Sequence, residues 1–148
     1  MTTRNRQVMK EVWQPVLGYE GLYEVSDQGR VRSLDRTIKT FSGPRTFKGR
    51  ILAPCKGGTK GYMVVRLSWP DRKKAYVHAL VAEAFHGLRP SGMDCRHLDD
   101  DHLNNCANNL AWGTRKENMA DARRNGKLAI GDRCKWQHRI RNQFGQFQ

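Results

Sequence analysis

The sequence predicts an α+β fold in which a small module rich in β-hairpins precedes a compact unit of two strands and a helix. Short apolar patterns separated by turn residues fill the N-terminal part, and stretches with helical signals follow them. With 38% hydrophobic residues in 148 positions, the chain can support only a modest core, which excludes a large multidomain enzyme. We divide it into residues 11–60, residues 61–126 and a basic tail, 127–148.

The N-terminal part is predicted to begin with a hairpin. The stretch GLYEVSDQGRVRSLD indicates two short strands, 22–25 and 30–34, joined by a Ser-Asp-Gln-Gly turn. The next segment, 36–61, is rich in Gly, Lys and Arg and is interpreted as looser chain. Beyond it, YMVVRL predicts another strand, which ends at a Pro-Asp turn.

An amphipathic helix is expected after that turn. Apolar residues recur there at the spacing of one helical face, namely Val77, Leu80, Val81, Ala84 and Phe85. This pattern is typical of a face that packs against a core. His78 lies off the stripe on the same helix, so we expect it at the surface or in a position that supports a neighbouring site.

The second unit is predicted to have the order strand, loop, strand, helix. Residues 93–97 and 109–112 are the strands, and Thr114 begins the helix with the capping box TRKE, in which Glu117 reaches back to the N-cap. Gly126 is expected just past the helix end. This order allows a side chain at the end of the first strand to approach one in the first turns of the helix.

Charge is distributed unevenly along a chain whose formal net charge is +13. Residues 1–90 have a net charge of +10 and residues 127–148 have +4, whereas residues 91–126 have −1. Positive segments of this size usually bind a polyanion, because Lys and Arg that neutralise phosphates release counterions. Nucleic acid is therefore the expected partner, and charge alone does not separate a binding protein from an enzyme.

The cysteines and the hydropathy narrow the class of protein further. Cys55, Cys95, Cys106 and Cys134 form no C-x-x-C pair, so we expect reduced thiols and disfavour a structural zinc. No long apolar run or apolar signal stretch is present in the sequence. We expect a soluble, intracellular protein.

Two stretches carry a family resemblance. RHLDDDHLNNCANNLAWGTRKEN resembles the HNH motif of ββα-metal endonucleases of the phage and homing type, since His97, Asn104-Asn105, Asn109-Leu110 and Asn118 recur at that family's intervals. EVWQPVLGYEGLYEVSDQGRVRSLDR is similar to the NUMOD4 module often joined to it. The resemblance implies a NUMOD4-like β module over 11–60, an HNH core over 61–126, and a metal-dependent DNA endonuclease encoded by a phage or mobile element and acting in the host cytoplasm.

The resemblance also implies roles for individual residues. His97 would be the general base, Asn118 a metal ligand, and Asn109 a residue that braces the loop and keeps the base oriented. This agrees with the chemistry, since phosphodiester hydrolysis needs a base for water and a cation beside the phosphate. A neutral imidazole is available at cellular pH, and an amide oxygen suits Mg²⁺, with Mn²⁺ as the alternative.

One position departs from the family pattern. Many relatives have an aspartate metal ligand directly before the catalytic histidine, whereas this chain has Arg96, which has no acceptor for a cation. Either another carboxylate replaces the ligand, or Arg96 itself binds the substrate phosphate. We favour Asp121, one helical turn after Asn118, as the replacement and interpret Asp99–Asp101 as a solvated turn.

The basic residues of the strands are expected to hold duplex DNA along its backbone. The candidates are Arg30, Arg32, Arg36, Lys48, Arg50, Lys73, Lys74 and Arg115. We expect no membrane partner, and the sequence leaves the oligomeric state open while favouring a monomer. The competing hypotheses are a DNA-binding protein on a decayed nuclease scaffold, motivated by Arg96, and an RNA-binding or RNA-cleaving protein, which rests on charge alone.

Overall fold

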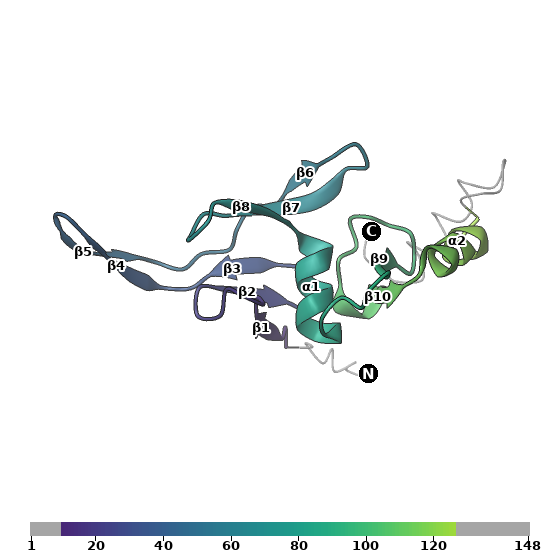
Figure 1. Cartoon of the computed structure of the whole chain (residues 1–148), viewed down its shortest axis with the longest axis horizontal. Coiled ribbons are helices and arrows are strands. Elements are labelled where there is room, and N and C mark those ends of the chain that lie inside the picture. The colour runs from purple at the N-terminus through teal and green to yellow at the C-terminus, as the bar shows by residue number, and fades with distance from the viewer. Residues whose placement is uncertain (1–9, 127–148) are drawn as a thin grey trace, which may run out of the picture.

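The computed structural model describes residues 10–126, in which small antiparallel sheets lie on one side of a central helix (Figure 1). This helix, α1 (Val77–His86), separates them from a further hairpin and the second helix, α2 (Arg115–Arg124). The predicted α+β class is confirmed. The predicted basic tail, 127–148, lies outside the described residues. Within residues 10–126, no helix has the length and apolar character needed to cross a membrane.

The first sheet contains the predicted hairpin. Its strands are β1 (Trp13–Pro15), β2 (Tyr23–Ser26) and β3 (Val31–Ser33), hydrogen-bonded in that order. Val25 pairs with Val31 across the turn, and both side chains are buried. The turn needs Gly29, whose φ of +81° is a left-handed conformation that side chains with a Cβ rarely adopt.

The segment expected to be loose contains three strands. β4 (Arg36–Thr40) and β5 (Gly43–Phe47) form a hairpin that projects away from the body (Figure 1). A three-stranded sheet combines β6 (Cys55–Gly57), β7 (Tyr62–Leu67) and β8 (Lys73–Tyr76). The prediction of looser chain over 36–61 is therefore wrong. Neither β4 nor β5 buries a side chain, so the apolar alternation of a half-buried strand is missing from their sequence.

A single hydrophobic core joins the sheets to the C-terminal unit through α1. The predicted helical stripe is confirmed, since Val77, Leu80 and Val81 are buried and Ala84 and Phe85 pack against them. The partners come from both sides of the helix and include Tyr23, Val25, Val65, Leu67 and Leu110. The two parts of the chain therefore share one helix and one core.

The C-terminal unit has the predicted order of elements. β9 (Asp94–His97) pairs with β10 (Leu110–Gly113), and a short 3-10 helix, η1 (Ala107–Asn109), precedes β10. The capping box is confirmed, because the Thr114 hydroxyl accepts from the Glu117 amide and the Glu117 carboxylate accepts from the Thr114 amide. Gly126, with φ +74°, follows the end of α2 as predicted.

Candidate active site

His97 ends strand β9 with its side chain inside the molecule. Its ring is only 4% exposed, and Nε2 lies 2.9 Å from Oδ1 of Asn105, which is also buried. An amide oxygen is an acceptor, so Nε2 carries the proton in the neutral imidazole. Nδ1 is then the nitrogen that can accept a proton, which is the requirement for a general base.

Aromatic rings from three other segments surround His97. Tyr62 of β7 stacks on it with centroids 6.0 Å apart, while His78 of α1 and His102 of the loop meet it edge-on at 5.3 and 5.7 Å. Burial, together with the two neighbouring histidines, lowers the pKa of His78 to about 4, so this ring is neutral at cellular pH. Nδ1 of His78 is buried and has no hydrogen-bond partner among the described residues.

The loop between His97 and β10 is organised around Asn109. Its amide nitrogen donates to Oδ1 of Asp99 at 2.9 Å and to the Asn104 carbonyl at 2.8 Å, and its amide oxygen accepts from the Asp99 backbone. Asp99 also accepts from the Asp101 backbone and the Asn104 side chain. The aspartates of this loop therefore have the hydrogen bonds of a built turn, and Asn109 has the contacts of a brace.

Arg96 faces α2 and forms an ion pair there with Asp121. Nη1 of Arg96 lies 2.8 Å from Oδ2 of Asp121, and Nη2 of Arg124 lies 2.7 Å from the other carboxylate oxygen. Asp121 and Arg96 are 5% and 14% exposed at their side chains. The guanidinium crosses Gly113, where an added Cβ would collide with Nε of Arg96. Both carboxylate oxygens of Asp121, the predicted replacement ligand, accept hydrogen bonds from arginines in this structure.

Asn118 has different surroundings, on the exposed side of α2. Its side chain makes no hydrogen bond to another described residue, so its amide oxygen can bind a ligand from solvent. No group of three His, Cys, Asp or Glu side chains within residues 10–126 is arranged to hold a metal ion. A cation here would therefore rely on Asn118, water and substrate oxygens, which suits hydrated Mg²⁺ better than an ion that needs a full protein cage.

The turn of the N-terminal hairpin contacts the same loop. The Ala107 amide donates to the Asp27 carbonyl at 2.7 Å. Gly29 lies directly against Asn105, where an added Cβ would be 3.0 Å from both its Cβ and its carbonyl oxygen. Asn105 is thus held between the β2–β3 turn and His97. No local pattern in the sequence indicates this arrangement or the place of Tyr62, because both depend on contacts between distant segments.

The predicted DNA-binding residues fall into two groups. Arg30, Arg32 and Lys48 form ion pairs with Glu11, Glu24 and Asp35, and the two arginines also lie over the Trp13 ring. Their charge is already balanced within the chain. The second group makes no ion pair with a described residue, and it consists of Arg36, Arg50, Lys73, Lys74 and Arg115.

Cys55 and Cys95 are free thiols. Cys95 packs beneath α1, where its thiol donates to the His78 carbonyl at 3.7 Å. Burial raises the pKa of Cys95 to about 12, so it remains a neutral packing group. Cys134 lies outside the described residues.

Comparisons with known proteins agree with this geometry. The family model described as the NUMOD4 motif matches residues 11–68, and the one described as HNH endonuclease matches residues 75–120. The chain is 33% identical over 119 residues to DNA endonuclease I-HmuI of Bacillus phage SP01, covering 80% of this chain and 61% of that protein. It is 30% identical over 140 residues to the uncharacterized HNH endonuclease L247 of Acanthamoeba polyphaga mimivirus, covering 90% of this chain and 31% of that one.

A solved structure is also similar. The structure described as DNA binding and cleavage by the HNH homing endonuclease I-HmuI aligns with a TM-score of 0.61 and 29% identity, over 88% of this chain and 66% of that one. The chain therefore spans less than two thirds of the phage relative. Residues 75–120, which contain His97, Asn109 and Asn118, therefore match the HNH endonuclease family, and together with the NUMOD4 motif before them and the similarity to the phage protein they support an HNH endonuclease of the phage type.

Proposed function

We propose that this protein is a metal-dependent endonuclease that hydrolyses phosphodiester bonds of duplex DNA inside the cell. The observation that carries the proposal is the hydrogen bond between Nε2 of His97 and Asn105, within a chain that matches the HNH family. An imidazole held in one tautomer at the end of a strand is suited to take a proton from water that attacks a phosphate.

His97 acts as the general base in this proposal. Nδ1 accepts a proton from the attacking water while Nε2 remains bonded to Asn105, whose oxygen stabilises the charge that develops on the ring. Asn109 contributes by fixing the loop that carries Asn105. Catalysis requires the scissile phosphate to reach His97, whose ring contacts those of Tyr62 and His102.

Positive charge beside the phosphate comes from two sources. Asn118 would hold a divalent cation, Mg²⁺ or Mn²⁺, which when bound stabilises negative charge on the phosphate and the leaving oxygen. Arg96 supplies a fixed guanidinium on β9, directly before His97. It shares the Asp121 carboxylate with Arg124, so this cluster keeps a net positive charge, and Asp121 determines the orientation of Arg96. We therefore leave Asp121 out of the ligand set and assign it to the positioning of Arg96.

The DNA duplex is held by the arginines and lysines that form no ion pair with a described residue. These lie on β4, on the segment between β5 and β6, on β8 and at the start of α2, so they can follow a phosphate backbone over a long surface. Arg30, Arg32 and Lys48 contribute less, because binding a phosphate would require them to leave a carboxylate.

Cleavage of supercoiled plasmid tests the proposal. The wild-type protein should nick or linearise it with Mg²⁺ or Mn²⁺ and not with EDTA, and His97→Ala should bind DNA without cutting it. Asn118→Ala should need a higher metal concentration for the same rate. Cutting by His97→Ala at the wild-type rate would remove His97 from the mechanism.

The second candidate is a DNA-binding protein on a decayed nuclease scaffold. The observation that favours it is the ion pair between Arg96 and Asp121, which joins β9 to α2. It predicts binding without cleavage in every metal. Restoring a carboxylate with Arg96→Asp separates the two, since only a decayed enzyme would gain metal-dependent cutting from that change.

A further inference from the structure

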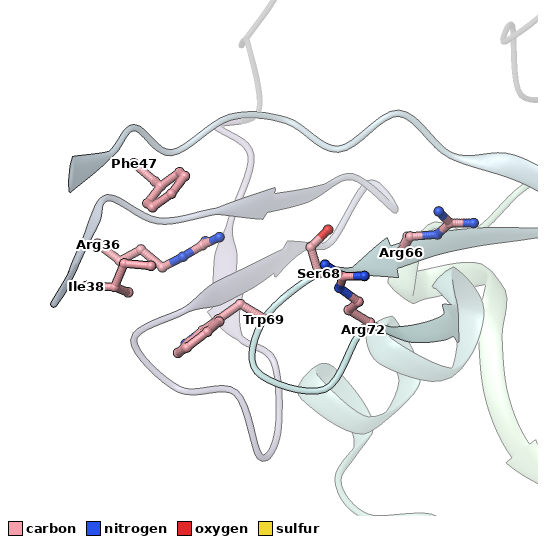
Figure 2. Close-up of a pocket in the computed structure, with 7 residues that line it drawn as sticks. All are labelled: Arg36, Ile38, Phe47, Arg66, Ser68, Trp69 and Arg72. Carbon is pink, nitrogen blue, oxygen red and sulfur yellow. The ribbon is translucent and has the colours of Figure 1, made fainter. Parts of the chain in front are cut away.

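A pocket of about 420 Å³ lies at the root of the projecting hairpin (Figure 2). One wall comes from β4 and β5, with Arg36, Ile38 and Phe47, and the other from the end of β7 and the turn that follows, with Arg66, Trp69 and Arg72. Strands β4 and β5, which form the first wall, and the β9–β10 hairpin lie on opposite sides of α1 (Figure 1). The pocket is therefore a site separate from the proposed active centre.

The charge of the pocket is positive and unbalanced. Arg36, Arg66 and Arg72 contribute guanidinium groups, none of which forms an ion pair with a described residue, and no acidic side chain lines the pocket. Nε of Arg36 is buried without a hydrogen-bond partner among residues 10–126. Guanidinium groups with unused donors on opposite walls fit a phosphate, which offers several acceptor oxygens.

The remaining walls are apolar and aromatic. Trp69 is 41% exposed, so its ring is accessible to a ligand. Ile38 adds an aliphatic surface. Arg36 lies over the Phe47 ring, with Cζ 5.4 Å from its centre. Flat apolar surfaces next to a phosphate site are what a nucleobase requires, since every base offers a π-face for stacking.

We propose that this pocket binds a single unpaired nucleotide of a DNA strand, with the base against Trp69 and the phosphate on Arg36, Arg66 and Arg72. Within a duplex, both faces of a base are covered by its neighbours, so only a base that has left the stack can enter. The DNA partner rests on the proposed function. The pocket adds a preference for distorted DNA, at a position away from the cut.

Binding to two duplexes tests the proposal. They are identical except that one contains a central unpaired nucleotide, and fluorescence anisotropy with the full chain in EDTA prevents cutting. We expect the bulged duplex to bind at least about fivefold tighter, the weak end of what stacking on an aromatic side chain contributes. Trp69→Ala should abolish this preference and Trp69→Phe should keep most of it, while Arg72→Ala should weaken the bulged complex more than the paired one.

Lys60→Ala is the matched control, because Lys60 is an exposed cation in the β6–β7 turn and does not line the pocket. It should weaken both complexes equally.

Equal binding of the two duplexes by the wild type, or a preference that survives Trp69→Ala, would overturn the proposal. If the protein cuts plasmid but does not prefer the bulged duplex, only the proposal for this pocket fails. If it prefers the bulged duplex but never cuts, only the proposed nuclease function fails.

Discussion

At the residue scale, Asn105 is the most direct test of how His97 is held, because its side chain hydrogen-bonds the His97 ring, which also contacts the rings of Tyr62, His78 and His102. Asn105→Ala should lower kcat for plasmid cleavage by about 10- to 100-fold, part of the roughly 10²- to 10⁴-fold that a general base contributes. DNA affinity should stay the same, because Asn105 is buried. Asn108→Ala, an exposed change in the same loop, is the control and should cut normally.

Asp121 provides a second prediction for a single residue. Asp121→Asn leaves two guanidinium groups without their carboxylate, so the free energy of unfolding should fall by about 3 kcal/mol in urea titrations. If Asp121 only positions Arg96, the Mg²⁺ concentration for half-maximal cleavage should match the wild type. A large rise in that concentration, like the one expected for Asn118→Ala, would return Asp121 to the ligand set.

His78 links the buried rings to pH. Its folded pKa of about 4 lies below the usual 6.5, so the unfolded chain takes up a proton that the folded chain does not. This proton uptake does not affect stability above pH 6.5. As the pH falls from 6.5 toward 4, it lowers the free energy of unfolding by roughly 2 to 3 kcal/mol. The groups that face His78 are Tyr62, Tyr76, His97 and His102.

Urea midpoints between pH 7 and pH 4.5 measure this loss. The variant His78→Phe keeps an aromatic ring without a titrating group, so its stability should fall less steeply over the same range. Parallel curves for the two proteins would show that other groups cause the acid sensitivity.

At the scale of elements, the sequence predicted well those that carry their own local signal. The β2–β3 hairpin has turn residues between buried valines, α1 has an apolar stripe, and α2 has a capping box. The β4–β5 hairpin has no such signal, since its side chains are all at least partly exposed. The site follows the same rule. The motif identified His97 and Asn118 because it is local in sequence, whereas the contacts of Asp121, Tyr62 and Gly29 join distant segments and could be seen only in the folded structure.

The β2–β3 turn provides the prediction at this scale. Gly29→Ala places a Cβ 3.0 Å from Asn105, so it should displace the amide that holds His97 and reduce cleavage about tenfold or more. Gly18→Ala is a matched control, because Gly18 has a similar φ of +77° but no atom within 4 Å of the added Cβ. Both variants should lose about 1 kcal/mol of stability from backbone strain, and only the first should lose activity. Equal activities would separate the turn from the site.

The whole molecule combines a high net charge with internal neutralisation of some of its cations. Binding constants measured against salt concentration distinguish the two groups of arginines. Arg36→Ala should reduce the slope of log K against log salt by about 0.9, the value for each phosphate that a cation neutralises on duplex DNA. Arg30→Ala should leave the slope nearly unchanged, because Glu11 already balances that charge. An equal reduction of the slope in both variants would mean that Arg30 leaves Glu11 when DNA binds.

The contact between the β2–β3 turn and the loop before β10 also bears on how such proteins change over evolution. The Asp27 carbonyl and Gly29 belong to the matched NUMOD4 region, while Ala107 and Asn105 belong to the matched HNH region. A graft that joins the HNH region to another N-terminal module would fold with its base poorly aligned unless the new module brought a carbonyl and a glycine to the same place. Recombination between relatives should therefore preserve this turn together with the loop it touches, even where the rest of the module is exchanged.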